Sequence, residues 1–233
     1  MGTSKSYITP RTKPNTAAKR GLTSYIHGGS VSLAKAVGRF AAAVTADNRA
    51  GATTDHSTGS FIHYGKKIGK VLGFISGAPA FGGILQFINE KYPENPPQSP
   101  NELFLRLLDE DTAIGTLDDA VVRKAFSITI ETLCIVNFEQ LDQMDLSVFA
   151  KELLANLAMT CFEQRYAVQI QSKANTLSQA QSKLEEFKRF IHNDIIANAD
   201  TSDIVQCIAN HNDLSAYVES KCVEIFSILE KYI

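Results

Sequence analysis

The glycine at position two is the first residue of the chain with distinctive chemistry, within the opening stretch MGTSKSY (1–7). A small residue there favours removal of Met1, which leaves the α-amine of Gly2 exposed. An α-amine titrates at about pH 7.7–8.0 and a lysine amine at about 10.4, so much of the α-amine is neutral and nucleophilic near neutral pH. The same residues fit the M-G-x-x-x-[ST] pattern of N-myristoylation. Two modifications of one nitrogen are therefore open, beside the alternative that Gly2 has no chemical role.

Motifs for catalysis by the chain itself are weak. The stretch GKKIGKV (65–71) is one residue too short for a phosphate-binding loop and ends in valine where a hydroxyl is needed. The stretch HGGS (27–30) is similar to an oxyanion loop, yet the G-x-S-x-G elbow that would supply the nucleophile is missing. The five histidines show no H-E-x-x-H or H-x-x-x-H pair. We therefore expect no catalytic residue, metal site or cofactor, and no enzyme.

The four cysteines lie in apolar helical contexts without a C-x-x-C pair, so we expect four buried, reduced thiols. The first thirty residues are polar and basic without a continuous apolar stretch, so no signal peptide is predicted. Both observations favour a cytoplasmic protein. The cysteines concerned are Cys134, Cys161, Cys207 and Cys222.

Charge is unevenly distributed along the chain. Residues 1–75 contain eleven Lys and Arg but only two acids, Asp47 and Asp55, whereas the remaining residues hold twelve bases and 23 acids. This asymmetry indicates that the N-terminal part meets a negatively charged surface. The sequence leaves three candidates open: the chain's own acidic half, an acidic protein partner, and nucleic acid or anionic lipid. A basic patch of Lys66, Lys67 and Lys70, interleaved with aromatic residues, is the candidate for nucleic-acid contact.

Periodicity predicts an all-α protein, in which a flexible basic N-terminal arm and a Gly-rich helix precede a C-terminal antiparallel helical bundle. Residues 1–29 are rich in Thr, Ser, Lys, Pro and Gly, which predicts an extended arm. In the basic, Gly-rich region 30–91, a first helix is expected from a Ser30 cap through Thr45. A small, polar stretch then predicts a loop over 45–60.

A stripe of glycines marks the second helix of this region, over 61–88. Because these glycines recur every four residues, they fall on one helical face and predict close packing against another backbone. The alternative is a membrane span over 71–88, which carries no charge but is weakly hydrophobic. We favour a buried helix bent at Pro79. The stripe consists of Gly65, Gly69, Gly73 and Gly77.

The Pro-rich stretch YPENPPQSP (92–100) predicts a linker between the basic region and an acidic bundle over 101–233. Ser99, Pro100 and Glu102 give a typical helix start, with an N-cap, a first-turn proline and a capping-box glutamate. Short polar turns between the later helices favour antiparallel packing. These later helices are predicted over 116–136, 145–174, 177–199 and 203–233, with a stop or pause at Asn137.

Five stretches, taken in order along the chain, resemble the QatB family, whose members are accessory proteins of the bacterial Qat anti-phage defence system. The resemblance implies three partners: a QueC-like enzyme of the QatC type, a P-loop ATPase and a TatD-like nuclease. It also implies that Gly2, followed by Thr3 and Ser4 as in the family motif, accepts a 7-deazaguanine-type base from the QueC-like enzyme. A bacterial source would exclude myristoylation, because eukaryotic transferases carry it out. The stretches are MGTSKSY, GRFAAAV, KVLGFIS, GTLDDAVVRKAF and YVESKCVEIFSILE.

We therefore expect a non-enzymatic substrate and scaffold protein whose first residues enter the QueC-like enzyme. The runner-up is a nucleic-acid-binding adaptor that uses the basic patch to position the TatD-like nuclease, and the third hypothesis is a membrane-associated effector using 71–88. Basic residues of the arm would steer it into the partner's cleft. The residues expected in that cleft are Gly2, Thr3, Ser4, Lys5, Ser6 and Tyr7.

Overall fold

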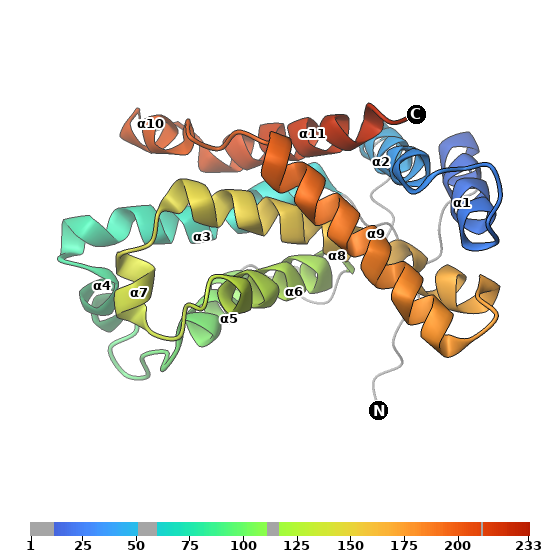
Figure 1. Cartoon of the computed structure of the whole chain (residues 1–233). Helices are drawn as coiled ribbons and strands as arrows, with labels where there is room; N and C mark the ends of the chain where they lie inside the picture. Colours follow the sequence, from blue (N-terminus) through green and yellow to red (C-terminus); the bar gives the residue numbers. More distant parts are fainter. Residues whose placement is uncertain (1–11, 51–59, 111–116, 211) are drawn as a thin grey trace.

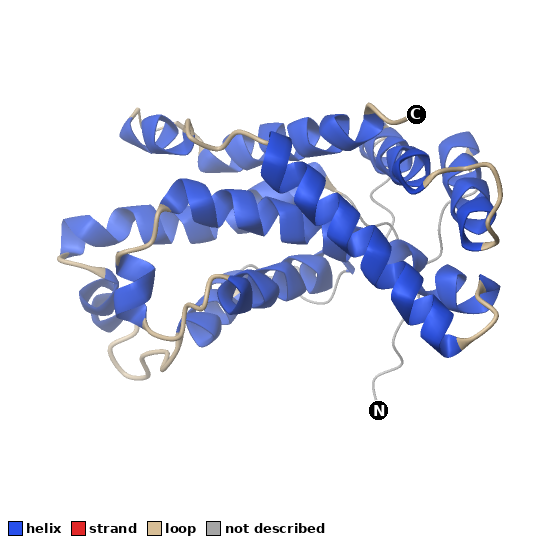
Figure 2. Ribbon diagram, in the orientation of Figure 1, coloured by secondary structure: helices blue, strands red, loops and turns tan. Residues whose placement is uncertain are grey.

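The computed structural model describes residues 12–50, 60–110, 117–210 and 212–233. All regular structure in these ranges is helical, which confirms the all-α prediction (Figures 1 and 2). The helices are α1 (Lys13–Ile26), α2 (Leu33–Arg49), α3 (Phe61–Gly77), the 3₁₀ helix η1 (Ala78–Phe81), α4 (Ile84–Lys91), α5 (Pro100–Asp109), α6 (Leu117–Thr132), α7 (Phe138–Asp142), α8 (Leu146–Lys173), α9 (Leu177–Asn198), α10 (Ile204–Ala209) and α11 (Leu214–Glu230).

The prediction of an extended arm through residue 29 is wrong for its second half, because α1 occupies Lys13–Ile26. Thr12 caps this helix by accepting a hydrogen bond from the Asn15 backbone N–H, and Pro14 lies in its first turn. The buried side of α1 carries Ala18, Leu22 and Ile26. A narrow apolar stripe against α2 is therefore enough to order a helix that its overall polarity argues against.

Capping side chains set most of the other helix starts. Ser99 accepts from the Glu102 backbone N–H as predicted, while the Glu102 carboxylate accepts from the backbone N–H of Gln98. The first cap of the basic region is Ser32 and not Ser30, and α2 continues past Thr45 to Arg49.

The predicted helix over 203–233 is two helices, α10 and α11. Asp213 accepts a hydrogen bond from the Ser215 backbone N–H and starts α11, so a capping aspartate restarts the helix after a break.

The glycine stripe on α3 packs against α11, as the spacing predicts. A Cβ at Gly69 would lie 2.7 Å from the Ser215 backbone nitrogen, and one at Gly65 would lie 2.5 Å from the Ser215 carbonyl oxygen. The two helices are in direct backbone contact there, which only glycine permits. At Gly73 the nearest atom is Leu214 Cδ1 at 3.7 Å, an ordinary contact. The close approach is therefore confined to the first half of the stripe.

The segment over 61–88 is not one helix bent at Pro79, because α3 ends at Gly77 and the chain turns at Gly82 and Gly83. α3 and η1 meet α4 at an angle of 104°, with Gly82 and Gly83 at the bend in positive-φ conformations. Within the described residues no single helix combines the length and apolar character of a membrane crossing, and only this bent pair has the composition for one.

Helices from both sides of the Pro-rich stretch share one hydrophobic core. α3 packs mainly against α11, and α2 also contacts α11 (Figure 1). The long helix α8 runs through the middle of the molecule between α6 and α9 and buries side chains along its whole length. The Pro-rich stretch therefore joins α4 to α5 within a common core, rather than separating two independently packed units.

Candidate functional site

The predicted modification site, Gly2, and the neighbouring residues Thr3–Tyr7 lie outside the described residues. The nearest described feature is the start of α1. There the Asn15 side-chain amide donates to Thr12 Oγ1 at 2.8 Å and to Asp47 Oδ1 at 2.9 Å. Asp47 also accepts from Arg165 Nη1 at 2.8 Å, in an ion pair with side chains 5% and 0% exposed. These contacts fix the start of α1 to α2 and α8.

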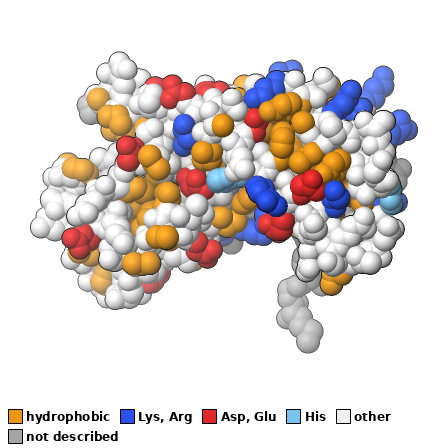
Figure 3. All heavy atoms as spheres, viewed as in Figure 1, with side chains coloured by type: hydrophobic (Ala, Val, Ile, Leu, Met, Phe, Trp, Pro, Cys, Tyr) orange, Lys and Arg blue, Asp and Glu red, His pale blue; other side chains and the backbone are white. Residues whose placement is uncertain are grey.

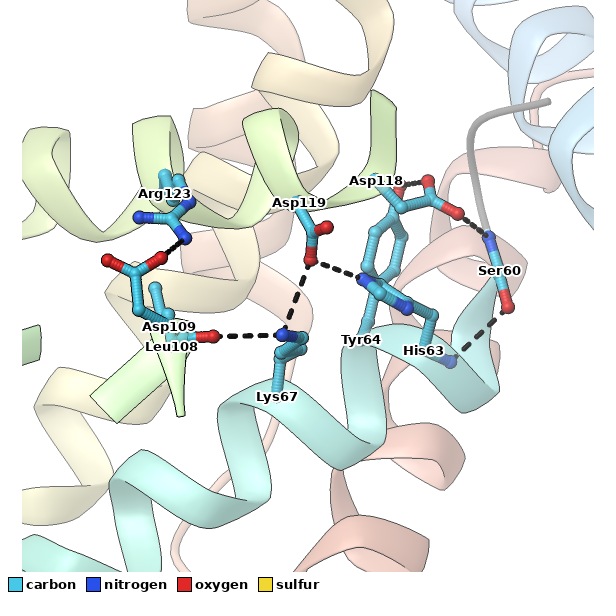
Figure 4. A network of polar contacts seen from close by, with 9 residues as sticks. All are labelled: Ser60, His63, Tyr64, Lys67, Leu108, Asp109, Asp118, Asp119 and Arg123. Atoms are coloured by element: carbon cyan, nitrogen blue, oxygen red, sulfur yellow. Dashed lines mark hydrogen bonds and ion pairs between the residues drawn. The ribbon is translucent and has the colours of Figure 1, made fainter. Parts of the chain in front are cut away.

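The predicted basic patch on α3 is only partly exposed. Lys67 is 3% exposed, and its ammonium donates to the Leu108 carbonyl at 2.9 Å and lies 3.5 Å from Asp119 Oδ1 (Figure 4). Lys70 forms an ion pair of 3.1 Å with Glu110. Lys66 is exposed. The prediction that these three lysines offer a joint surface to nucleic acid is therefore wrong for Lys67, and α3 instead meets the acidic half of its own chain.

Two adjacent acids at the start of α6 receive the side chains of α3. Asp119 Oδ1 lies 3.0 Å from His63 Nε2, and Asp118 Oδ1 accepts from the Tyr64 hydroxyl at 2.9 Å (Figure 4). Asp118 also accepts from the backbone N–H of Ser60 at 3.4 Å. Both acids occupy the first turn of α6, where the helix dipole stabilises negative charge. The first turn of α6 is thus the acceptor for the basic helix.

The Tyr64 hydroxyl links this pair of acids to the anchor of α1. It contacts Cys161 of α8, which lies one turn before Arg165 and also contacts the Arg165 guanidinium. Burial raises the pKa of the Tyr64 phenol well above its usual value, and burial likewise raises the pKa of the Cys161 thiol. We call this set the interhelical polar network; it comprises Asn15, Asp47, Arg165, Cys161, Tyr64 and Asp118.

The chemistry of the interhelical polar network favours a structural role. A thiol is a nucleophile only as the thiolate, and a raised pKa keeps Cys161 protonated near neutral pH. The two carboxylates accept hydrogen bonds from side chains of three other helices, because Asn15 of α1 and Arg165 of α8 donate to Asp47, and Tyr64 of α3 donates to Asp118. The network joins five helices and fixes the point at which the described chain begins.

The other cysteines only partly follow the prediction of four buried thiols. Cys161, Cys207 and Cys222 are buried, but Cys134 is exposed. Cys134 lies two residues beyond the end of α6 in the left-handed region, with φ 52°, a position that favours glycine. In the described residues no group of three His, Cys, Asp or Glu side chains could hold a metal ion.

A second polar cluster joins α9 to α8 and was not predicted from the sequence. His192 Nε2 of α9 lies 2.7 Å from Glu152 Oε1 of α8, and the same oxygen accepts from the Asn156 side chain at 3.1 Å. The hydrogen bond to Glu152 raises the pKa of His192 above its usual value. His192 and Glu152 are forty positions apart in the sequence. The only sequence signal for their contact is that each lies in a periodic helical segment.

An open groove of about 450 Å³ lies between α2 and α9. Leu33, Phe190 and Ala197 give it apolar walls. Of its acidic residues, Glu186 accepts from Lys183 and Asp194 accepts from Tyr232. Glu186 also accepts from the Tyr25 hydroxyl of α1, so both acids of the groove link α9 to neighbouring segments.

One comparison with known proteins places the chain in a family. A family model described as "Qat anti-phage system associated protein QatB" matches residues 89–229. The chain belongs to the QatB family. Membership makes it a component of the Qat anti-phage defence system, with partners inside that system. The family's description names its members as associated proteins of that system. Comparisons with curated proteins and with solved structures gave no significant match.

The matched region of this QatB-family protein runs from the end of α4 through almost all of α11. It includes the acids at the start of α6, Arg165 of α8 and the face of α11 that receives the glycine stripe. The N-terminal residues and helices α1 to α3 precede it. The family signature therefore covers the half of the molecule that receives the basic helices.

Proposed function

We propose that this QatB-family protein is a non-enzymatic substrate and scaffold whose processed N-terminus, Gly2, is modified by a QueC-like partner of the QatC type. The modification would be a 7-deazaguanine-type base joined to the α-amine. The resemblance of the first residues to the family motif is what suggests the acceptor. The α-amine of an unhindered glycine is also the most reactive amine in the chain near neutral pH.

The proposed step is acyl transfer to nitrogen. The partner would first activate a carboxylate of the base precursor with ATP: a carboxylate oxygen attacks the α-phosphorus, an acyl adenylate forms and pyrophosphate leaves. The neutral α-amine then attacks the acyl carbon, so a C–N bond forms while the bond to the adenylate oxygen breaks and AMP leaves with the electron pair. The amine loses one proton to a base, and an amide remains. Only a neutral amine held at attack distance can react in this way.

The anchor at the start of α1 supports this role. Ten peptide links join Gly2 to Thr12, and a fully extended chain of that length spans about 35 Å. Thr12 itself is fixed through Asn15 to the buried pair of Asp47 and Arg165. With Thr12 fixed, a chain of this length would let the amine reach into a deep active site while the helical body stays outside. This anchored root is the observation on which the proposal depends.

The test is the intact mass of the protein after co-expression with the QueC-like partner. We expect loss of Met1 and a mass increase that fragmentation locates at Gly2. Gly2→Pro should remove the adduct, whereas Lys5→Arg, which removes the nearest side-chain amine, should keep it. Loss of Met1 without an adduct would contradict the proposal, as would an adduct that persists in Gly2→Pro.

The runner-up is an adaptor that binds nucleic acid through Lys66, Lys67 and Lys70. Two of these three lysines are engaged by other parts of the chain. Lys67 is buried against Leu108 and Asp119, and Lys70 is paired with Glu110. An adaptor that positions a TatD-like nuclease would need another cationic surface.

A further inference from the structure

The antiparallel helices α1 and α2 carry an unusual excess of positive charge. They hold six cations and a single acid, Asp47, which is buried and paired with Arg165. Among the described residues no ion pair involves any of the six cations. We call this surface the α1–α2 cationic face; its cations are Lys13, Lys19, Arg20, Lys35, Arg39 and Arg49.

Helical spacing places most of these cations on the outer sides of the two helices. Positions separated by four, seven, eleven and fourteen residues fall on one helical face. On α2 this face carries cations and alanines, on α1 it carries cations, small side chains and one histidine, and neither face carries an acid. The stripe of α1 is Lys13, Ala17, Arg20, Ser24 and His27, and the stripe of α2 is Lys35, Arg39, Ala42, Ala46 and Arg49.

The two stripes lie next to each other. Asn15 contacts Asp47 near one end of the hairpin, and the Arg39 side chain crosses Gly21, with its Cδ 2.9 Å from where a Cβ would be. This antiparallel register brings Arg20 level with Arg39. Figure 3 shows Lys and Arg side chains gathered over the end of the molecule that α1 and α2 form in Figure 1. Gly21 makes room for one of these cations.

The composition of the face indicates which class of partner it fits. Protein–protein interfaces have an apolar, often aromatic centre, whereas protein–nucleic acid interfaces are more polar and far more positive. No large hydrophobic side chain is exposed between Thr12 and Ala50. The exposed ones in the described chain lie elsewhere, for example Val136, Val168 and Val205. Small residues between the cations would let a phosphate backbone approach the helices closely.

We propose that the α1–α2 cationic face binds the sugar–phosphate backbone of a nucleic acid. Lys and Arg side chains neutralise phosphates and release counterions, which supplies affinity without reading sequence. From Lys35 to Arg49 the stripe of α2 spans about 21 Å, the length of about six nucleotides of one strand. This inference does not depend on modification of Gly2, because it concerns folded helices and is tested without the QueC-like partner.

The experiment measures binding of the purified full chain to fluorescently labelled nucleic acids of about 20 nucleotides or base pairs, over a series of salt concentrations. The probes are a DNA duplex, a single-stranded DNA and a single-stranded RNA of mixed sequence. We expect binding to at least one probe, with affinity that falls steeply as salt rises. Replacing two cations of the face, in Arg20→Gln/Lys35→Gln, should weaken binding about thirtyfold at about 0.15 M salt and lower the salt slope by about two.

The matched control is Lys91→Gln/Arg123→Gln, which changes the net charge equally but alters cations paired with Glu110 and Asp109. It should bind within about twofold of the parent protein, and Arg20→Lys/Lys35→Arg should restore binding. Thermal unfolding of each variant verifies the fold. Three outcomes would overturn the proposal: no binding to any probe at about 50 mM salt, equal losses in both double variants, or tighter binding to poly-glutamate than to every nucleic acid.

Discussion

Helix α3 and the α1–α2 hairpin both belong to the basic half of the chain, yet they use their charge in opposite ways. On α3, Lys67 lies 3.5 Å from Asp119 and Lys70 lies 3.1 Å from Glu110, so the acidic half neutralises these cations. On α1 and α2, six cations have no acidic partner within the described residues. The charge asymmetry of the sequence therefore has two components. One component pairs with acids of the same chain, and the other is the surface that we propose binds nucleic acid.

Burial determines how much each component matters for stability. A buried cation is costly to desolvate, and removing its partner leaves that cost uncompensated. An exposed cation is solvated by water whether or not a partner is present, so its replacement changes stability little. The two regions should consequently respond to mutation on different scales.

The largest effect should follow removal of the acid that α3 contacts. Asp119→Ala leaves the buried Lys67 ammonium without its carboxylate and deprives His63 of its partner. We expect the free energy of unfolding to fall by about 3 kcal/mol or more. Urea unfolding followed by circular dichroism gives this value.

The control for this variant is Asp109→Ala, which breaks the exposed ion pair with Arg123. It should cost at most about 1 kcal/mol. Equal losses in the two variants would show that the Asp119 contacts are no more important than a surface pair, and the distinction between the two basic regions would fail.

The glycine stripe should give the next largest effect. In Gly69→Ala the new methyl group would lie 2.7 Å from the Ser215 backbone nitrogen, so α3 and α11 must move apart. We expect a loss of about 1–3 kcal/mol in the free energy of unfolding. Gly73→Ala meets only Leu214 at 3.7 Å and should be neutral or stabilising by up to about 1 kcal/mol, because alanine is the better helix former. Thermal and urea unfolding of both variants measure the difference; a destabilised Gly73→Ala would mean that the close contact extends along the whole stripe.

Much of this packing follows from local sequence signals. The period of four predicts the close contact of α3, because glycines on one helical face have few other uses. The Ser99 cap is equally legible, since the capping side chain and the first turn are adjacent in sequence. Such features depend on residues within a turn or two of each other.

The misses have two physical causes. For α1, the low apolar content predicts an arm, while the decisive signals were the Thr12 cap and the spacing of Ala18, Leu22 and Ile26. Both signals can be read from the sequence, but the polar composition of residues 1–29 favoured the prediction of an arm. The pair of Asp47 and Arg165 joins residues 118 positions apart, and nothing in one sequence specifies that contact. The candidate anchor for the N-terminus could therefore be found only from the structure.

The contact between His192 and Glu152 is a paired cation only while His192 is protonated, so its contribution to stability should depend on pH. Its hydrogen bond to Glu152 raises the pKa of His192 in the folded protein above the unfolded value of about 6.5. The stabilisation is therefore fully present below the unfolded pKa and is lost as pH rises through the folded pKa. We expect His192→Gln to lower the free energy of unfolding by up to about 1 kcal/mol at about pH 5.5, with a smaller difference at about pH 8.5.

Glu152→Gln provides the matched control, because it keeps the size of the side chain while removing the charge that His192⁺ faces. In that background the effect of His192→Gln should no longer depend on pH. Urea unfolding at both pH values, for the parent, the two single variants and the double variant, isolates the pairwise contribution. Coupling between His192 and Glu152 that is no larger at the lower pH than at the higher would contradict this prediction. His192 would then contribute as little to stability as the unpaired cations of α1 and α2. Stabilising ion pairs would be confined to the contacts of α3 and to permanently charged side chains.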